Sequence, residues 1–398
     1  MKGPFSIWTF FGLTLFIDII TLIVFYITGG KEKLVNPYEP LKKVSVLIPI
    51  HREKEEDIVK TIKAVYSESY PVHNVIICSG SANAKPFIYK LNKNYGNLLY
   101  IKCPNVSKAK KINYVVKNAD NLLGEFLYVR DCRVKGEFRC IEKMMAHFNK
   151  DKVAAVTSYG RLSKPKNALS KAYYYGKSWI NEIGRFRKNA QEKRGAVFVV
   201  CGASTIYRTD ILKKIPIPCG SKTEDTYYTW ILQNKGYRIH VADDAVVSAP
   251  DVDGEKLTGI NNQIKQSYRW SCGTLQCMYR EGRNMFGNKK LFYTTIFPGL
   301  LESIMYTIPL VFLPILFFID VRFAIGFLIG DTVFSLLGTL AIIPEKFFKT
   351  LVHYPEILFF KYVNGAVFLA SLAVVTFQGA TNNTKSWANE WLPPPTAL

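Results

Sequence analysis

The chain has 398 residues, enough for one large domain or two ordinary ones. Residues 31–290 contain 46 of the 52 Lys and Arg and 24 of the 31 Asp and Glu, which gives this segment a net charge of +22. Four apolar runs flank it, each close to the roughly 20 residues that cross a bilayer. They lie at residues 5–29, 292–318, 321–343 and 356–379. The pattern excludes a wholly soluble protein and predicts an integral membrane protein with one basic intracellular domain.

The positive charge is compatible with nucleic acid or with a membrane surface as the partner. The sequence has no zinc-finger spacing, RNP-like motif or other nucleic-acid module. A basic domain between membrane spans lies against anionic headgroups and follows the positive-inside rule. We therefore expect membrane lipids and an anionic substrate as partners, and no nucleic acid. The eight cysteines form no CxxC pair, so we expect reduced thiols rather than disulfides or zinc binding.

The first apolar run is longer than that of a signal peptide and has no small-residue cleavage site. Lys31 and Lys33 follow it, which places the N-terminus outside the cell membrane and the middle domain in the cytosol. Three further spans place the C-terminus outside as well. We thus expect a span in residues 1–30, a cytosolic domain in 31–290, and three spans with an interfacial segment near 346–355 in 291–398. The outer tail contains the sequon Asn382-Asn383-Thr384, which is either a glycosylation site or a chance match.

Between the spans, short apolar runs alternate with helical patterns. Strands are expected at 44–49, 75–78, 98–101, 126–129, 153–157 and 198–204, and helices at 50–66, 109–117 and 166–192. This alternation predicts an α/β domain with a Rossmann-like, mostly parallel sheet, whose ligands bind at the carboxyl ends of the strands. Asp131 follows the fourth strand at such an end, and Gly202 lies in a small-residue turn where backbone can approach a ligand closely.

Residues 223–273 join an acidic pair, Glu224 and Asp225, to a second group of polar side chains. Gln266, Arg269 and Trp270 are spaced i, i+3 and i+4, which places them on one face of a helix. A carboxylate can deprotonate a hydroxyl nucleophile, and a cation beside an aromatic ring can hold a departing pyrophosphate and a sugar. The combination indicates sugar transfer.

Five such pieces occur in order, and together they resemble the membrane-embedded family 2 glycosyltransferases with a GT-A catalytic fold. That group includes the cellulose, hyaluronan, chitin and poly-N-acetylglucosamine synthases and ceramide glucosyltransferase. The likeness covers residues 44–275 by motif and the remainder by the arrangement of spans. The pieces are Pro49 with Glu53, the run from Lys108 to Asn113, Asp131, Thr223-Glu224-Asp225, and Gln266-x-x-Arg269-Trp270.

The resemblance implies an inverting transfer in which Asp225 is the general base. The alternative role for Asp225 is to cap the following helix. Glu224 either orients Asp225 or is solvated at the surface. Asp131 would bind Mg²⁺ or Mn²⁺ across the two phosphates, or else pair with Arg130 or Arg133. The family commonly has a second acid where Arg133 stands, so Arg133 itself is a candidate phosphate contact.

The resemblance also assigns residues to the two substrates. On the donor side these are Glu53, Ser79, Lys108, Lys110, Gln266, Arg269 and Trp270, and on the acceptor side Gly202 and Trp270. The lysines are alternatively solvated, and the Arg–Trp pair alternatively belongs to an interfacial belt. The family usually has acids that read the nucleotide base after its second strand, where this chain has Cys78 and Ser79. A UDP-sugar donor is expected, with base recognition by Ser79 and backbone groups.

Two outcomes are open within this class, a processive polysaccharide synthase and a single-transfer enzyme that glycosylates a lipid, like ceramide glucosyltransferase. The run Thr-Glu-Asp-x-x-x-Thr-Trp-x-Leu-Gln from residue 223 favours the synthase. A third alternative, motivated by the missing acids, is a non-catalytic protein on a transferase scaffold. Glu302 and Asp331 fall within predicted spans, where acids either line a polar path or pair with buried Arg or Tyr.

Overall fold

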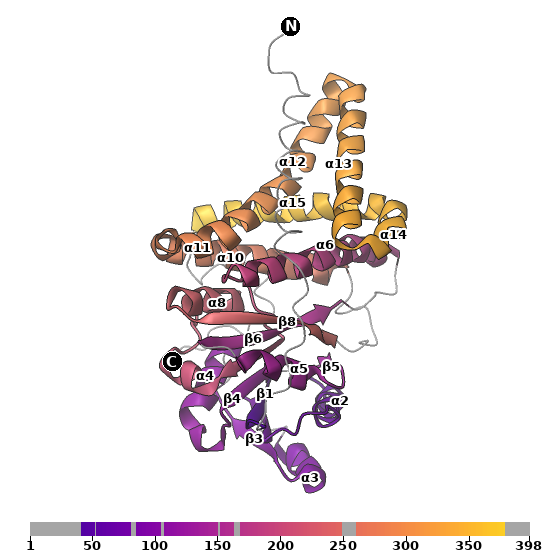
Figure 1. Cartoon of the computed structure of the whole chain (residues 1–398). Helices are drawn as coiled ribbons and strands as arrows, with labels where there is room; N and C mark the ends of the chain where they lie inside the picture. Colours follow the sequence, from indigo (N-terminus) through magenta and orange to yellow (C-terminus); the bar gives the residue numbers. More distant parts are fainter. Residues whose placement is uncertain are drawn as a thin grey trace.

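The computed structural model describes residues 41–51, 53–80, 85–104, 107–149, 152–162, 168–248 and 260–378. The predicted first span and the sequon at Asn382 lie outside these residues. A sheet with its covering helices forms one part of the molecule, and a layer of long helices lies against it (Figure 1). From this second layer the helices α12 and α13 extend away from the sheet.

The sheet has eight strands in the order β3-β2-β1-β4-β7-β6-β8-β5. Strands β1, β2, β3 and β4 are parallel, so their carboxyl ends meet at one edge, while β7 runs antiparallel between β4 and β6. This confirms the mostly parallel α/β fold. The strands are β1 Val44–Ile50, β2 Asn74–Ser79, β3 Leu98–Lys102, β4 Phe126–Arg130, β5 Lys135–Gly136, β6 Val153–Arg161, β7 Ser204–Arg208 and β8 Arg238–Ser248.

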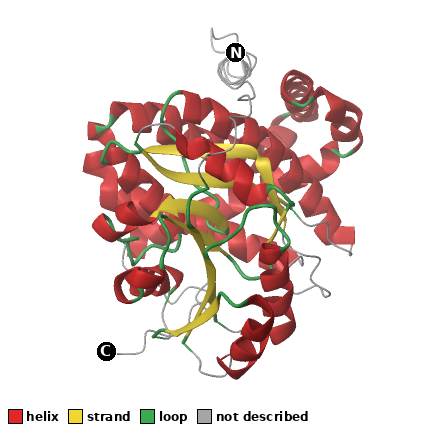
Figure 2. Cartoon of the chain, turned by 60° about the horizontal axis from the view of Figure 1, so that its bottom comes forward, coloured by secondary structure: helices red, strands yellow, loops and turns green. Residues whose placement is uncertain are grey.

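Helices cover both faces of the sheet (Figure 2), and this explains why the strands are almost continuously apolar. Side chains alternate between two buried clusters: Ile48 and Tyr128 belong to one, and Leu47 and Val129 to the other. The covering elements are α2 Glu55–Tyr66, α3 Lys85–Tyr95, α4 Lys108–Asn118, η2 Asp120–Leu122, α5 Cys140–Ala146, η3 His147–Asn149, α7 Thr209–Lys214 and α8 Glu224–Asn234.

Two element predictions for this domain are wrong in part. The helix expected from residue 50 begins at Glu55, because Ile50 still pairs with Ser79 as the last residue of β1. The strand expected at 198–204 is absent, and β7 begins at Ser204. The backbone N–H groups before it donate to side chains instead of a strand ladder. These bonds are Val197 to Gln233 Oε1 (2.5 Å), Val200 to Thr229 Oγ1 (3.2 Å) and Cys201 to Thr157 Oγ1 (2.6 Å).

The second layer consists of α6, α10 and α15, with α15 lying across α12 and α13 in Figure 1. Among the described residues, two helical segments are long and apolar enough to cross a membrane, Val321–Ile342 and Tyr354–Phe377, and Leu310–Ile319 is a shorter apolar segment. The elements are α6 Ala168–Lys193, α10 Ile260–Gly287, α11 Lys289–Leu291, η4 Phe292–Ile296, α12 Phe297–Ile319, α13 Val321–Ile342, η5 Pro344–Lys346, α14 Phe347–Val352 and α15 Tyr354–Gln378.

Asp331, one of the two acids expected within spans, is paired. Its carboxylate accepts hydrogen bonds from Lys361 Nζ at 2.7 Å and from the Tyr354 hydroxyl at 2.5 Å. The Lys361 ammonium also lies 5.6 Å from the centroid of the Trp179 ring on α6. Asp331 thus joins α13 to α15, as the alternative role of a buried partner predicts. The Glu302 side chain lies outside the described part of the chain.

Candidate active site

Asp131 immediately follows β4, and Lys108 holds it in place. The Lys108 ammonium, on the first residue of α4, pairs with Asp131 Oδ1 and donates to the Gly202 carbonyl. The Asp131 N–H donates to Ala203 O at 3.0 Å. Arg130 is not the partner of Asp131, because its guanidinium lies in the core against Glu68 at 2.6 Å. The end of β4, the start of α4 and the turn before β7 therefore meet at one point.

The acidic pair opens α8 beside this point. Thr223, not Asp225, is the N-cap residue of α8, and Asp225 Oδ1 accepts the adjacent Thr226 N–H at 2.8 Å. Burial raises the pKa of Asp225, and the charges of Lys108, Arg269 and Lys188 oppose this rise. Burial and the neighbouring Asp225 charge also raise the pKa of Glu224. A half-buried carboxylate with a raised pKa beside several cations is the kind of group that acts as a general base.

Gly202 lies against the Asp225 carboxylate. A Cβ at this position would overlap Asp225 Oδ2 and lie 3.1 Å from its Cγ. The φ angle of Gly202 is not in the left-handed region. Glycine is needed here because a side chain would clash with Asp225, and not because of the backbone conformation. The close backbone approach expected at Gly202 is therefore made to Asp225.

We predict that Gly202→Ala lowers kcat by about 100-fold, because the added methyl group displaces the Asp225 carboxylate. The fold should persist, since the site is otherwise half-buried and unstrained. The measurement is sugar transfer together with thermal unfolding. Gly160→Ala is the matched control, because its Cβ would meet nothing closer than Cys201 Sγ at 3.7 Å. Equal activity of the two variants would contradict this geometry.

Helix α10 brings the second motif to the acidic pair. Arg269 lies within electrostatic reach of Asp225. Gly273, one turn further on, touches the residue before the acidic pair, since a Cβ there would lie 2.5 Å from Thr223 Oγ1. Trp270 is 43% exposed, which leaves its ring open to a ligand. A glycine thus lets the two halves of residues 223–273 pack in direct contact.

Two lysines on α6 belong to the site and were not expected from the sequence. Lys177 Nζ donates to Gln266 Oε1 at 2.9 Å and lies 5.3 Å from the Trp270 ring centroid, and burial lowers its pKa to about 8. Burial also lowers the pKa of Lys188, which lies within electrostatic reach of Asp225. The two are eleven residues apart, close to three helical turns, so they share a face of α6. This spacing of the two lysines is the feature of the sequence from which their common position could have been predicted.

The donor-side residues lie at the same edge of the sheet. Ile50 pairs with Ser79, so β1 and β2 end level, and Leu47 pairs with Val129, so β4 ends two residues earlier at the same edge. The Glu53 carboxylate accepts the His51 N–H at 2.5 Å, and the Ser79 carbonyl accepts the Cys103 N–H at 2.9 Å.

The remaining lysine assigned to the donor, Lys110, is exposed and lies within electrostatic reach of Cys219. Lys111 is the buried lysine of this run, and it donates to Ile50 O at 2.7 Å. Lys108, Asp131, Gly202, Glu224, Asp225 and Arg269 therefore form one cluster, and Lys110 and Glu224 both lie within electrostatic reach of Cys219.

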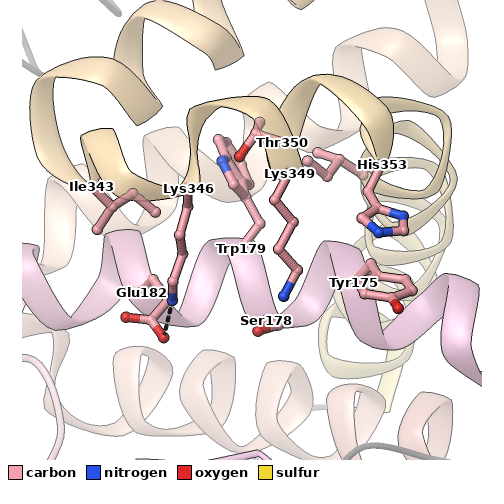
Figure 3. Close-up of a pocket in the computed structure, with 10 residues that line it drawn as sticks. Tyr175, Ser178, Trp179, Glu182, Ile343, Lys346, Lys349, Thr350 and His353 are labelled. Atoms are coloured by element: carbon pink, nitrogen blue, oxygen red, sulfur yellow. Dashed lines mark ion pairs between the residues drawn. The ribbon is translucent and has the colours of Figure 1, made fainter.

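A separate small cavity lies between α6 and the turn that joins α13 to α15 (Figure 3). Tyr175 and His353 stack there with ring centroids 3.6 Å apart, and Lys346 pairs with Glu182 at 2.6 Å. Its volume of about 30 Å³ is enough for one or two waters but not for a nucleotide sugar. The cavity belongs to the contact between helices and not to the site.

The sheet and its covering helices form a GT-A fold, in which the acidic pair meets the cation–aromatic helix. Residues 45–216 match the family model for glycosyl transferase family 2. This segment is a family 2 glycosyltransferase domain, as the motifs predict.

Relatives and solved structures agree with this family. The "Uncharacterized glycosyltransferase YaiP" of Escherichia coli (strain K12) is 33% identical over 107 residues, 27% of this chain and 25% of the relative. The hyaluronan synthase of Streptococcus pyogenes is 24% identical over 256 residues, 59% of each chain. The chain thus spans about a quarter of the length of YaiP and about three fifths of the length of the hyaluronan synthase. The solved mannosyltransferase PcManGT from Pyrobaculum calidifontis, in complex with GDP-Man and Mn²⁺, shares the fold with a TM-score of 0.59 and 14% identity, covering 93% of this chain and 99% of that one.

Proposed function

We propose that this protein is an inverting glycosyltransferase in which Asp225 activates the acceptor. The acceptor hydroxyl oxygen attacks the anomeric carbon of a nucleotide sugar and gives its proton to Asp225. The bond from that carbon to the diphosphate oxygen breaks, and the nucleoside diphosphate leaves. The observation that carries this proposal is the half-buried Asp225 carboxylate, held by Thr226 N–H against Gly202 with Lys108 and Arg269 nearby.

The cations around Asp131 suit the leaving diphosphate. Lys108 and Arg269 flank the two acids, and a guanidinium binds phosphate through paired N–H donors. Asp131 would hold Mg²⁺ or Mn²⁺, which neutralises charge on the diphosphate when bound. A single carboxylate fits this role, because Mg²⁺ in such sites takes one or two carboxylates and completes its shell with phosphate oxygens and water. The Mn²⁺ and GDP-Man bound to PcManGT support this assignment.

We propose further that the product is a polysaccharide made by a processive synthase at the cytosolic face of the cell membrane. The similarity to hyaluronan synthase over 59% of both chains supports this, as does the run from Thr223 to Gln233. In that run Trp230 Nε1 donates to Phe198 O at 2.8 Å and Gln233 binds both the N–H and the carbonyl of Val197. These bonds hold the segment that leads to Gly202. The apolar helices α13 and α15 support a multi-pass arrangement, and we propose that both termini lie outside.

The test is to incubate the protein in membranes with Mn²⁺ and, separately, radiolabelled UDP-glucose, UDP-N-acetylglucosamine, UDP-glucuronic acid and GDP-mannose. A synthase puts label into a ladder of long chains, and EDTA removes it. Label confined to the organic extract indicates single transfer to a lipid and overturns the processive assignment. Incorporation no greater than in Asp225→Asn with every donor, singly and in pairs, overturns the enzymatic proposal.

A further inference from the structure

Two buried histidines and a half-buried glutamate converge outside the active site. They are His147 in η3, Glu192 in the last turn of α6 and His240 in β8, and one ligand atom from each lies within 4.8 Å of the other two. The chain has five histidines, and two of them meet here. In the sheet order β8 is the third strand from β4, which at the usual strand spacing is about 14 Å away. The cluster is thus separate from Asp131.

The contacts of Glu192 leave one of its oxygens directed at the histidines. Oε2 accepts the Val241 N–H at 2.7 Å, which fixes the carboxylate on the edge of β8. Oε1 lies within ion-pair range of His240 Nδ1, yet neither atom forms an aligned hydrogen bond among the described residues. The side chains of His240 and Glu192 are only 7% and 9% exposed. Bulk water therefore has little access to these two atoms. The imidazole of His147 lies with its ring centroid 5.8 Å from that of His240.

A divalent cation can bind Glu192 Oε1 and both imidazoles at once, whereas a proton can bridge only two of these groups. Two imidazole nitrogens and one carboxylate oxygen are ligands that Zn²⁺ accepts in tetrahedral sites at about 2.0–2.2 Å, with water in the fourth position. Ligand atoms at that radius lie about 3.4 Å apart. Glu192 Oε1 and His240 Nδ1 are closer than this and would have to separate, while pairs near the 4.8 Å limit would have to approach each other. The Val241 N–H bond to Glu192 is the outer contact that orients a ligating carboxylate.

We propose that His147, Glu192 and His240 bind one Zn²⁺, with water as the fourth ligand. The ion would join η3 and β8 to the end of α6, the helix that carries Lys177 and Lys188 to the active site. Its ligands are nitrogen and oxygen, so the site does not conflict with the absence of cysteine pairs. It also does not depend on the proposed reaction, because its function is to fix a helix to the sheet.

The test uses the purified full chain in detergent, treated with chelator and with its free thiols alkylated so that cysteines cannot bind the metal. Zn²⁺ is titrated against a chromophoric competitor, with thermal unfolding followed in parallel. We expect one tight equivalent that raises the Tm. His147→Gln and His240→Gln should each weaken binding by at least about 100-fold and abolish the rise in Tm, while exposed His73→Gln is the matched control.

Tight Zn²⁺ binding that survives both substitutions overturns the proposal, and so does the absence of Zn²⁺ binding by the wild-type chain. A preference for Mn²⁺ over Zn²⁺ at this site overturns the choice of metal. If a variant fails to fold, Co²⁺ added to the wild-type chain gives an independent measurement. Four-coordinate Co²⁺ absorbs strongly in the visible range, and an octahedral-type weak spectrum contradicts the site.

Discussion

Replacing Asp225 with Asn is expected to lower kcat by about 100-fold to 10,000-fold, the usual contribution of a positioned general base. The amide keeps the shape of the side chain and its Oδ1 can still accept the Thr226 N–H, but it cannot take the acceptor proton. Donor affinity should change much less, because Lys108 and Arg269 remain. Turnover of labelled donor and donor binding by calorimetry measure the two effects separately.

The control for this variant is Asp210→Asn, which removes an exposed carboxylate on α7. Undiminished turnover in Asp225→Asn would contradict the assignment of Asp225 as the base. If donor affinity and kcat fell by equal factors, Asp225 would instead be a donor-binding residue. The raised pKa adds a pH signature. Asp225 is active as the carboxylate, so activity is lost as pH falls through a pKa above that of an ordinary Asp.

The second large effect is on stability and concerns the ion pair beneath the site. The side chains of Arg130 and Glu68 are 0% and 1% exposed and lie 2.6 Å apart. Arg130 Nε also donates to Val134 O at 3.0 Å, and Glu68 Oε2 accepts the Ile141 N–H at 3.0 Å. We expect Arg130→Met to cost about 3–5 kcal/mol of unfolding free energy, because it leaves a buried carboxylate without its partner.

The pH dependence of this loss follows from Glu68, whose pKa burial already raises. Without Arg130 the folded state favours the protonated carboxyl still more, so the variant should lose least stability at low pH and more as pH rises. Chemical unfolding in detergent at two pH values measures this. Arg139→Gln breaks an exposed pair with Glu142 and should cost less than about 1 kcal/mol. Equal losses for the two arginines would contradict the account.

The sequence was informative wherever a pattern is local. Strands β1, β2, β3 and β4 were predicted because apolar runs buried on both faces leave a clear signal. Asp131 and the acidic pair at Glu224 and Asp225 were predicted because their positions follow from strand ends and motif order. The resemblance also correctly indicated the family.

What the sequence did not reveal depends on contacts between distant segments. The absent strand at 198–204 has a strand-like composition, but side chains 29–44 residues away bind its N–H groups. Lys177 and Lys188 appear as ordinary surface lysines until α6 is packed over the site. The three residues of the proposed zinc site are separated by more than forty positions each, so no spacing rule connects them.

The contact between Gly273 and Thr223 has a mechanical consequence. Helix α10 is one continuous helix that packs on α8 through this glycine and also packs on α15. Because Gly273 lets the α10 backbone lie directly against Thr223, a sliding or tilting of α10 would move the start of α8 with it. Asp225 is two residues from Thr223. Under the proposed function, a movement of α10 on the side of α15 would therefore shift Asp225, the proposed base.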